Sequence, residues 1–432
     1  MCWVTSAFAG SSRRINAPAM RVLILSQYYT PEPVPKPSEL AEALARRGHE
    51  VTVLTGFPNY PSGDLYEGFR LRPLQKSIVA GIPVTRAFEY PYHGTHALGR
   101  MLNYASFMIA APLASLFMPK CDAIYVWHPP LTVGVSAAII AKLRGVGFLY
   151  DVQDIWPESA VLSGLLKEGL LVRFMAWLER FVYRQADHLL VVTDGARENV
   201  IGKGVPPAKV SVGKHWIDEQ LFAPAGDEIR RVTRHEQGWA DRFVLLFAGN
   251  LGLVQGLDTL VDAAAALPSD SNAVIAIVGD GSDRQRLQDL VASRGLTHRV
   301  QFLARRPMDA MPALFAAADA LLVHLRKSEL SRLVIPTKTL AYLAAGRPIV
   351  MAMEGAAADL VRDARAGLVL PSEDAPALVK AVETLRTMSE AERRLMGERA
   401  MAFLAAHFSK DLVIQEYEET LRSVAASRGK RA

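Results

Sequence analysis

The stretch from Met20 to Thr55 decides the fold and reads MRVLILSQYYTPEPVPKPSELAEALARRGHEVTVLT. Its apolar runs at 21–26 and 50–55 predict two strands. Between them, the pattern predicts a helix that begins with Ser38 as its N-cap and ends at Gly48. A strand, a helix and a second strand in this order form a βαβ unit, which is typical of a parallel sheet.

The same alternation continues along the chain in two series. In the first series we expect further strands at 122–127, 147–152 and 187–193. A chain of 432 residues exceeds the roughly 250–300 residues that one hydrophobic core supports. The fold class is therefore α/β, with two doubly wound domains and ligands expected between them, at the carboxyl ends of the strands. The second series begins near Asp241, with strands at 243–248, 274–278, 300–303, 320–323, 349–352 and 368–370.

The boundaries follow from these strands and from the composition between them. Residues 1–19 differ from the rest, and we expect a disordered extension ahead of a natural start at Met20. A twin-arginine export signal at Arg13-Arg14 is the alternative, although no apolar run follows it. The expected organisation is an extension at 1–19, a first domain at 20–212, a polar, irregular linker at 213–240, a second domain at 241–408 and a terminal helix at 409–432 that packs back on the first domain.

Composition and charge exclude several classes of protein. Lysine and arginine number 49 against 44 aspartates and glutamates, and this surplus is spread along the chain. Because a nucleic-acid-binding protein usually concentrates its positive charge, we expect no nucleic acid as a partner. The 2 cysteines cannot build a disulfide framework, and no cluster of His and Cys suggests a metal site. The sequence therefore favours a reducing cytoplasm and no bound metal.

Two glycine-containing turns follow strands of the second domain. Gly249, Asn250 and Gly252 form one turn, and Gly279 and Gly281 belong to the other. Small residues at such turns let backbone N–H groups approach a phosphate at a helix N-terminus. Neither turn has the full GxGxxG pattern, and a tight connection between strand and helix is the alternative for each.

A lysine near the start of a later helix is a further candidate. The stretch IPTKTLAYLAAGRP at 335–348 predicts a helix with Pro336 in its first position and Lys338 in its first turn. A lysine there opposes the helix dipole, and a bound diphosphate would compensate it. A solvated lysine is the alternative.

In the first domain, YDVQDIWPES at 150–159 ends a strand with acidic residues. The carboxylate of Asp154 is our candidate for a general base on an acceptor hydroxyl, and Glu158 is a further catalytic candidate. His128 ends another strand and is expected to point toward the same site. An aspartate that caps a turn and a structural histidine beside proline are the alternatives.

Residues 101–118 are apolar and have basic residues on either side. The segment only just reaches the roughly 18 residues of a membrane span. We interpret it as a helix partly exposed to lipid, with Phe107 and Ile109 on the lipid side. Burial in the domain core is the alternative. Residues 170–183 mix aromatic side chains with arginines, as membrane-surface helices do.

Together these features resemble glycosyltransferase family 4, the retaining GT-B class, from Met20 to about Arg422. Three stretches resemble bacterial surface-polysaccharide transferases of the colanic acid and O-antigen fucosamine type, and three match the wider class. The first three are SQYYTPEP at 26–33, RGHEVTVLTGFPNYP at 47–61 and DIWPES at 154–159. The others are FAGNLG at 247–252, IVGDG at 277–281 and AAGRP at 344–348.

The resemblance implies two Rossmann-like domains with the active site in the cleft between them. It implies transfer, with retention, of a sugar from a nucleotide-sugar donor, a UDP-sugar being favoured, to a lipid-linked saccharide in exopolysaccharide or O-antigen biosynthesis. The enzyme is expected as a peripheral protein on the inner face of the plasma membrane, with no cofactor. Gln27, Tyr28 and Tyr60, which lie in the subgroup motifs, are the expected acceptor-binding residues.

The chain departs from the family pattern at charged positions of the donor site. The two glutamates of the family's Glu-x7-Glu motif fall on Leu333 and Ala341. The arginine and lysine of its phosphate loop fall on Asn250 and Gln255. Lys338 is therefore expected to supply positive charge to the donor phosphates, together with Arg305, Arg306 or Arg326.

The acceptor side also departs from the pattern. The Gly-Gly of the family falls in the region of Val34 and Pro35. The histidine often taken as the acceptor-site base falls on Gln153, which leaves the neighbouring Asp154 as the candidate.

Three other functions stay open. A nucleotide-sugar 2-epimerase shares the architecture but needs no membrane surface, so the apolar segment at 101–118 favours the transferase. A nicotinamide-dependent oxidoreductase would need GxGxxG after the first strand, whereas residues 27–37 contain no glycine. A non-catalytic sugar-nucleotide-binding protein is the third alternative, because the acidic pair is lost. The sugar, the linkage and the acceptor structure are not readable from the sequence.

Overall fold

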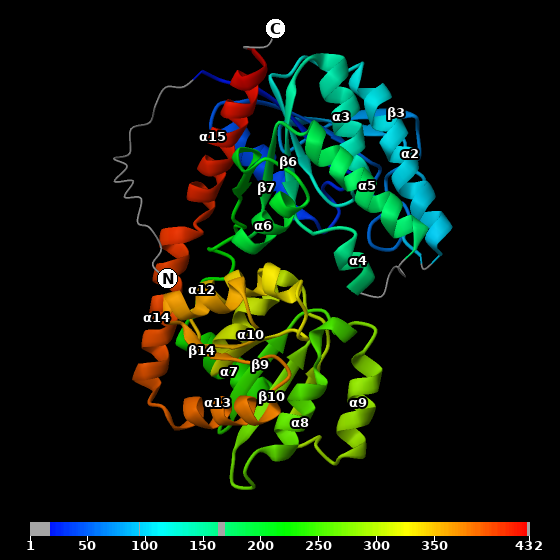
Figure 1. Cartoon of the computed structure of the whole chain (residues 1–432). Coiled ribbons are helices and arrows are strands. Elements are labelled where there is room, and N and C mark those ends of the chain that lie inside the picture. Colours follow the sequence, from blue (N-terminus) through cyan, green and yellow to red (C-terminus); the bar gives the residue numbers. More distant parts are fainter. Residues whose placement is uncertain (1–17, 95, 163–168, 430–432) are drawn as a thin grey trace.

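The computed structural model describes residues 18–94, 96–162 and 169–429. It consists of two α/β bodies, one above the other in Figure 1, each with a sheet between helices. Each sheet has a hydrophobic core cluster on both of its faces. The expected N-terminal extension lies outside the described residues, apart from Pro18 and Ala19.

The N-terminal domain holds an eight-stranded sheet in the order β3-β4-β2-β1-β5-β6-β7-β8. Neighbouring strands are parallel except for the antiparallel pair β3 and β4. The strands are β1 (Arg21–Leu25), β2 (Glu50–Thr55), β3 (Leu74–Val79), β4 (Ile82–Ala87), β5 (Ala123–Trp127), β6 (Gly147–Val152), β7 (His188–Val191) and β8 (Val210–Val212). The helices are α1 (Pro35–Arg46), α2 (Ala97–Ser115), α3 (Thr132–Arg144), α4 (Glu158–Leu162), α5 (Leu170–Gln185) and α6 (Asp194–Gly202).

The C-terminal domain holds a six-stranded parallel sheet in the order β11-β10-β9-β12-β13-β14. Its strands are β9 (Phe243–Ala248), β10 (Ala273–Val278), β11 (Val300–Leu303), β12 (Ala320–His324), β13 (Ile349–Ala352) and β14 (Gly367–Leu370). Its helices are α7 (Asp227–Glu236), α8 (Asp258–Ala266), α9 (Arg284–Ser293), α10 (Met311–Ala317), α11 (Thr337–Ala344), α12 (Ala356–Ala364), α13 (Ala375–Thr387) and α14 (Glu390–His407).

The strands expected from the sequence are confirmed, whereas β3, β4 and β8 were missed. The missed strands form the two ends of the N-terminal sheet, where one face or both are partly exposed. Their sequences therefore lack the continuous apolar runs of the central strands. Pro83 in β4 further obscured the pattern, because proline is unusual inside a sheet.

The start expected for α1 is wrong by one turn. The helix begins at Pro35, and Ser38 lies inside it, where its hydroxyl donates to the carbonyl of Pro35 at 2.8 Å. Proline lacks an N–H group and has a fixed φ, so it fits the first turn of a helix, where the backbone donors have no intrahelical partner.

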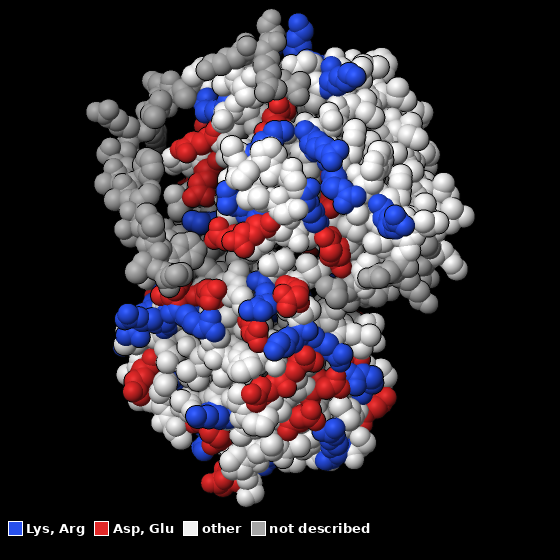
Figure 2. All heavy atoms as spheres, in the orientation of Figure 1, with Lys and Arg blue, Asp and Glu red and all other residues white. Residues whose placement is uncertain are grey.

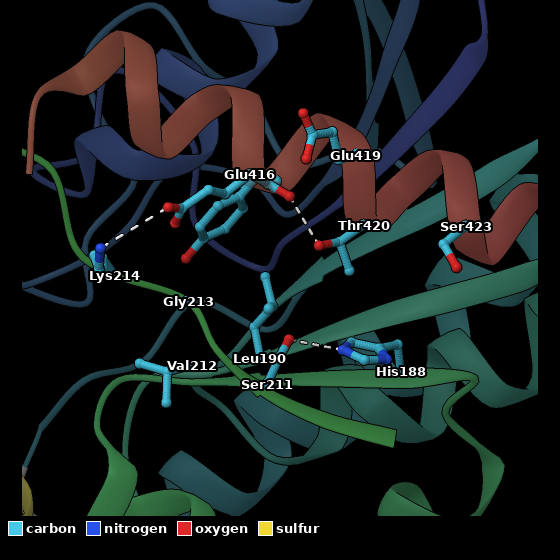
Figure 3. A pocket seen from close by; sticks show the side chains of 11 residues that line it. His188, Leu190, Ser211, Val212, Gly213, Lys214, Glu416, Glu419, Thr420 and Ser423 are labelled. Atoms are coloured by element: carbon cyan, nitrogen blue, oxygen red, sulfur yellow. Dashed lines mark hydrogen bonds and ion pairs between the residues drawn. The ribbon is translucent and has the colours of Figure 1, made fainter. Parts of the chain in front are cut away.

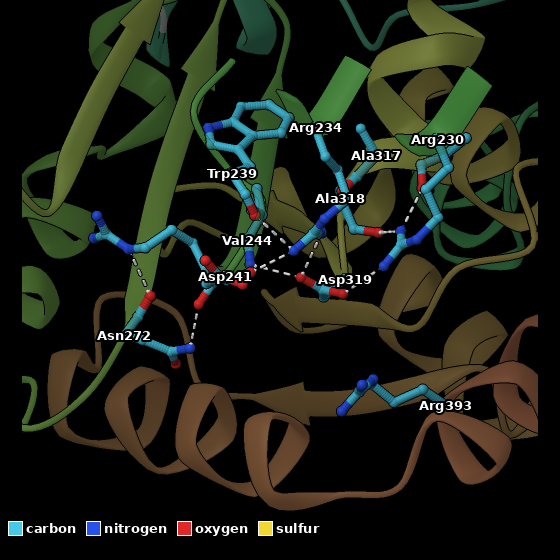
Figure 4. A network of polar contacts seen from close by, with 12 residues as sticks. Arg230, Arg234, Trp239, Asp241, Val244, Asn272, Ala317, Ala318, Asp319 and Arg393 are labelled. Atoms are coloured by element: carbon cyan, nitrogen blue, oxygen red, sulfur yellow. Dashed lines mark hydrogen bonds and ion pairs between the residues drawn. The ribbon is translucent and has the colours of Figure 1, made fainter. Parts of the chain in front are cut away.

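Part of the expected linker belongs to the C-terminal domain, so its description as irregular is wrong for α7. Arg230 and Arg234 of α7 form ion pairs with Asp319 at 2.8 and 3.0 Å (Figure 4). Asp319 also accepts the backbone N–H of Val244, the second residue of β9, at 2.9 Å. This network fixes α7 at the edge of the sheet where the strands begin.

The last helix, α15 (Lys410–Gly429), runs from the lower body to the upper body in Figure 1. Its apolar side chains join the core cluster of the N-terminal domain. Tyr417 donates to the buried carboxylate of Asp151 at 3.3 Å, and Tyr125 donates to the same oxygen at 2.5 Å. A surface pocket of about 570 Å³ lies between this helix and strands β7 and β8 (Figure 3).

The carboxyl ends of the two sheets face each other across the interface between the domains. Thr193, directly beyond β7, donates to the carbonyl of Leu333 at 2.5 Å. Leu333 lies in η4 (Ser331–Leu333), a 3-10 turn between β12 and α11. Because both residues follow strand ends, the loops that follow the strands in each domain meet at this interface.

Candidate active site

The two glycine-containing turns of the C-terminal domain, here called the donor turns (249–252 and 279–281), lie directly against each other. The N–H of Gly249 donates to the carbonyl of Val278 at 3.0 Å, and Leu251 donates to Asp280 at 2.8 Å. A Cβ on Gly279 would lie 1.9 Å from the carbonyl oxygen of Gly249. The packing therefore requires glycine at 279.

The two donor turns are equally close to each other at Gly281. Gly281 has a φ of 157°, and a Cβ there would lie 2.5 Å from the carbonyl oxygen of Leu251. The side chain of Asn250 lies over Gly252 and Gly281. These contacts explain the glycines as a tight backbone junction, which was the alternative interpretation. Phosphate binding at the donor turns stays a prediction.

Lys338 lies beside the donor turns, in the first turn of α11 as expected. Its Nζ is 3.8 Å from the centre of the Phe247 ring and donates to Gln255 Oε1 at 3.3 Å. A Cβ on Gly249 would lie 2.8 Å from this Nζ. Pro336 is the N-cap of the helix and not its first residue, which corrects the position expected for this proline.

The charge of Lys338 has no counterion among the described residues. Burial lowers the pKa of its ammonium group to about 7. Removing the ammonium from water disfavours its charged form, and no nearby carboxylate restores it. The contacts with Phe247 and Gln255 favour a packed lysine over the solvated-lysine alternative, and binding of an anion by Lys338 stays a prediction.

The three arginines proposed with Lys338 lie in different surroundings. Arg326 is exposed beyond β12, where it lies against Gly256 and pairs with Asp258 at 3.4 Å. Arg305 and Arg306 are exposed after β11, the outermost strand, which is separated from β9 by β10. The structure therefore brings Arg326, and not the other two, next to the loop that contains Gln255.

The positions where the family has two glutamates have apolar surroundings. Leu333 packs against Gly195 of α6, in the other domain. Ala341 is buried in α11. The Leu333 position thus contributes to the contact between the domains.

On the N-terminal side, Asp154 lies just beyond β6, and its side chain is accessible to solvent. Nearby protein atoms desolvate the carboxyl and raise its pKa. No residue in the described ranges forms a hydrogen bond or ion pair with it. An accessible carboxylate without a partner fits the proposed role better than the turn-capping alternative, and its catalytic role stays a prediction.

Of the other two catalytic candidates, His128 is buried and Glu158 is partly exposed but held in an ion pair. His128 is 2% exposed, and burial lowers the pKa of its imidazole to about 3, so the ring is neutral. Glu158 forms an ion pair with Lys203 at 2.8 Å, and Lys203 also binds Glu179. These contacts favour structural roles for His128 and Glu158.

Sequence reasoning did not single out two further charged residues, Asp151, which is buried, and Lys36, which is partly buried. Asp151 accepts from Gln153 Nε2 at 2.6 Å, so it orients the residue that replaces the family's histidine. Lys36, in the first turn of α1, contacts His215 and lies 4.7 Å from the centre of the Trp216 ring. Burial lowers the pKa of Lys36 to about 7. An acid inside the apolar run of β6 was the available signal for Asp151.

The expected acceptor residues form part of an aromatic cluster, defined here as Tyr28, Tyr60, His93 and Trp127. The ring centre of Tyr28 is 5.0 Å from that of Tyr60, 5.8 Å from His93 and 6.4 Å from Trp127. Tyr28 is buried, whereas Tyr60 and His93 are partly exposed. The sequence did not indicate His93, because the strand before it, β4, was missed.

Gln27 is fully buried behind this cluster. Its Nε2 donates to Asn103 at 2.8 Å, and Asn103 and Asn59 both donate to one oxygen of Glu89, at 2.8 and 2.6 Å. Burial raises the pKa of Glu89 to about 8. Gln27 therefore belongs to a buried hydrogen-bond network, and its direct contact with an acceptor is not favoured.

Comparison with known proteins defines the class. The model for the glycosyl transferase 4-like domain matches residues 36–213, and the model for glycosyl transferases group 1 matches residues 230–402. The two matches together cover most of the chain. The chain therefore belongs to the glycosyltransferases of family 4, with the GT-B fold, as the motifs predicted.

Particular relatives narrow the class. The chain is 28% identical over 347 residues to WcaI of Escherichia coli, named for colanic acid biosynthesis, with 78% of this chain and 84% of WcaI covered. It is 23% identical over 344 residues to the glycosyltransferase WbjE of Pseudomonas aeruginosa, covering 78% and 83%. The crystal structure of Anabaena HepE with UDP has a TM-score of 0.71 at 20% identity, covering 94% of this chain and 100% of HepE.

None of the described helices combines the length and the apolar character needed to cross a bilayer. Within the same residues, no three His, Cys, Asp or Glu side chains converge on a point that would hold a metal. The need for a metal or cofactor is not decided by this observation.

Proposed function

We propose that the protein transfers a sugar, with retention of configuration, from a UDP-sugar to a lipid-linked saccharide during exopolysaccharide or O-antigen assembly. The observation that carries this proposal is Lys338, a partly buried cation without a counterion among the described residues, next to the donor turns. A diphosphate bound beside Lys338, at the donor turns, would supply the missing negative charge. The complexes of HepE with UDP and with UDP-glucose support a uridine nucleotide as the donor carrier.

The acceptor hydroxyl is expected on the opposite domain, near Asp154. There the free carboxylate would accept a hydrogen bond from the incoming hydroxyl, or stabilise positive charge that develops on the donor sugar. Gln153, held by Asp151, would orient the same groups. Both domains therefore contribute to the reaction, which explains why their loops meet at one interface.

An apolar face on the N-terminal domain supports an acceptor held at a membrane. This apolar face consists of exposed side chains of the helices α2, α3 and α5, and the corresponding region of Figure 2 is largely free of charged residues. Glu179 is the acidic residue of these three helices, and it is buried against Lys203. The members are Leu98, Met101, Leu102, Ile109, Leu113, Ile139, Leu143, Leu170, Leu171, Phe174 and Trp177.

Basic residues accompany this apolar face. Lys142 of α3 and Arg173 and Arg180 of α5 are exposed. An apolar surface with basic neighbours and no exposed acid suits the interface of an anionic membrane. We therefore place the protein on the inner face of the plasma membrane as a peripheral enzyme. Phe107 is not part of this face: it is fully buried, so its expected lipid exposure is wrong, whereas Ile109 is exposed.

The donor part of the proposal is tested by calorimetric titration with UDP. Lys338→Ala should weaken binding by about 1.5–3 kcal/mol, or roughly tenfold or more, because a charge-assisted contact is lost. Lys380→Ala is the matched control, since Lys380 is an exposed lysine of α13 in the same domain. Equal affinity of the wild type and Lys338→Ala would contradict the phosphate role.

The transfer itself is tested with a radiolabelled UDP-sugar and membranes that contain lipid-linked saccharides. Label should move into the lipid fraction, and the anomeric configuration of the product should match that of the donor. Formation of an epimeric nucleotide sugar without any acceptor would support the 2-epimerase alternative instead.

A further inference from the structure

A cavity of about 610 Å³ lies in the C-terminal domain, at the edge of the sheet where the strands begin. Three segments far apart in the sequence form it: the start of α7, the turn between α11 and β13, and the first turns of α14. The donor turns follow the opposite, carboxyl ends of the strands, so this cavity is separate from the candidate active site. We call it the arginine pocket, and its charged residues include Asp227, Arg230, Arg347, Glu390, Arg393 and Arg394.

Close packing at two glycines fixes the three segments against one another. A Cβ on Gly397 of α14 would lie 1.9 Å from the carbonyl oxygen of Gly346, in the turn before β13. A Cβ on Gly346 would lie 3.0 Å from the sulfur of Met401 and 3.2 Å from Cγ of Pro224, the residue that brings the chain to α7. The walls of the arginine pocket are therefore held by the fold itself, before any ligand binds.

Among the described residues, Arg347 is the arginine of this pocket without a hydrogen-bonding partner. Its side chain is partly buried, and burial, assisted by the charge of Arg230, lowers its pKa to about 10. By contrast, Arg230 pairs with Asp319 at 2.8 Å (Figure 4), and Arg394 pairs with Glu398 at 3.4 Å. Guanidinium groups in such surroundings normally bind a carboxylate or a phosphate, so Arg347 is suited to an anion that enters the pocket.

The remaining lining is mixed in charge. Arg393 (Figure 4) donates to the carbonyl oxygens of Leu385 and Met388 at 2.7 and 2.6 Å through one nitrogen, and no carboxylate within the described ranges pairs with it. Asp227 and Glu390, the first residues of α7 and α14, are exposed carboxylates of the same pocket. Carboxylates repel a bare anion but accept hydrogen bonds from hydroxyl groups. The lining therefore favours a ligand that carries both a phosphate and hydroxyls.

We propose that the arginine pocket binds a phosphorylated sugar, with its phosphate on Arg347 and Arg393 and its hydroxyls donating to Asp227 and Glu390. The volume of the pocket supports this class of ligand, because sites for small organic molecules measure about 300–1,000 Å³, whereas a single inorganic ion needs far less space. This second site goes beyond the proposed function, since it uses neither the donor turns nor the acceptor residues.

The test is a calorimetric titration of glucose 1-phosphate, inorganic phosphate or glucose into the full-length protein saturated with UDP. UDP fills the donor site first, so that binding there is not mistaken for binding in the arginine pocket. Arg347→Gln removes the proposed phosphate contact. Arg399→Gln is the matched control, because Arg399 is an exposed arginine of α14 that does not line the pocket. Failure to bind UDP would contradict the donor site alone, and the titrations would then be made without it.

The wild type and Arg399→Gln should bind glucose 1-phosphate roughly tenfold more tightly than inorganic phosphate, and glucose should not bind. Arg347→Gln should bind glucose 1-phosphate roughly tenfold more weakly than the wild type and keep its affinity for UDP. The proposal is overturned if the wild type does not bind glucose 1-phosphate, or if Arg347→Gln binds it equally well. Equal affinities of the wild type for phosphate and glucose 1-phosphate would overturn the sugar part.

A second variant tests the hydroxyl contacts on a residue whose change does not endanger folding. Glu390 is exposed, and the capping box of Ser389 and Glu392 holds the start of α14 without it. Glu390→Ala should bind inorganic phosphate more tightly, because a negative charge is removed, and glucose 1-phosphate more weakly, because a hydroxyl acceptor is lost. An unchanged ratio of these two affinities would contradict the role of Glu390 in binding the sugar.

Discussion

The donor side of the interface is built from backbone turns, whereas the acceptor side is built from side chains. Gly249 and Gly279 bring two loops into direct contact, and a single cation, Lys338, lies beside them. On the acceptor side, buried amides and a carboxyl hold aromatic rings that come from several loops. Turns of small residues leave room for a diphosphate, which is common to all nucleoside diphosphate sugars, whereas side chains suit the variable acceptor.

This difference has a physical consequence for catalysis. The donor loops are fixed by packing that leaves no room for a Cβ at 279, so the donor site is rigid before any ligand binds. Asp154 has no partner that fixes it within the described residues. Substitutions on the donor side should therefore change affinity, and substitutions on the acceptor side should change turnover.

The largest effect is expected for Asp154→Asn. Loss of the carboxylate should lower turnover by about two orders of magnitude or more, because acid–base and electrostatic assistance are both removed. UDP affinity should stay near that of the wild type, since the nucleotide is expected on the other domain. Transfer rates and UDP titrations on the same preparation provide the measurement.

Glu158→Gln is the control for this variant, because Glu158 is held by Lys203. It should lower the melting temperature and leave turnover near normal. If Asp154→Asn melts earlier but keeps near-normal turnover, Asp154 is a structural residue and the comparison of the two sides fails.

The central strands could be predicted from the sequence because they are buried on both faces. β9 and β10 are continuous apolar runs, and a glycine directly follows each of them. Both the strands and the donor turns could therefore be located from the sequence. The end strands could not, since β3 is half exposed and β4 contains Pro83. Missing β4 also removed the loop with Glu89 and His93 from consideration.

Some residues of the candidate site could likewise be predicted from the sequence, and others could not. Lys338 was found because it follows a recognisable helix start, and its position beside Gly249 agrees with that reasoning. His128 was proposed from its position at a strand end, but the sequence did not reveal that the fold buries it. Glu89 has no local signal, because its partners Asn59 and Asn103 lie 30 and 14 residues away in the sequence and only the three-dimensional structure brings them together.

A second prediction concerns the pH dependence of UDP binding. Burial lowers the pKa of Lys338 to about 7, so above this pH the free enzyme loses the proton that attracts the diphosphate. UDP affinity should therefore fall as pH rises above 7, by up to roughly tenfold per pH unit, because binding must then take up a proton.

Calorimetry in buffers of different ionisation enthalpy measures this proton uptake directly. Lys338→Met is the comparison variant, and its UDP affinity should be weaker and independent of pH above 7. The same steep decrease in Lys338→Met would assign the proton to another group and break the link between Lys338 and the donor.

A third, smaller effect distinguishes two neighbours on α2. Ile109→Glu should weaken binding to anionic vesicles by about 1 kcal/mol, or roughly fivefold, because one apolar contact with lipid is lost. The melting temperature should not change, since Ile109 is 62% exposed. Phe107→Glu should instead unfold the domain, because it buries a charge without a partner.

Flotation and thermal melting of the two variants provide this measurement. Unchanged vesicle binding in Ile109→Glu would show that α2 does not contact lipid. Unfolding of Ile109→Glu would mean that the exposed stripe is part of a protein interface.

The smallest effect at low pH is expected for Glu89→Gln. Burial raises the pKa of Glu89 to about 8 from its ordinary 4.5, so the folded protein holds a proton that the unfolded chain releases between these values. Stability from Glu89 is therefore complete below pH 4.5 and is lost as pH rises to 8, by up to about 1.4 kcal/mol per pH unit.

Glutamine keeps the oxygen that accepts from Asn59 and Asn103 and carries no titrating proton. Melting curves should thus coincide for both proteins at low pH, and the variant should become increasingly more stable than the wild type as pH rises from 4.5 to 8. Glu32→Gln is the control: Glu32 accepts three backbone N–H groups through both oxygens, so its variant should be destabilised at every pH. A uniform loss of stability in Glu89→Gln would mean that Glu89 is ionised, and that the acceptor side contains a buried negative charge instead of a neutral carboxyl.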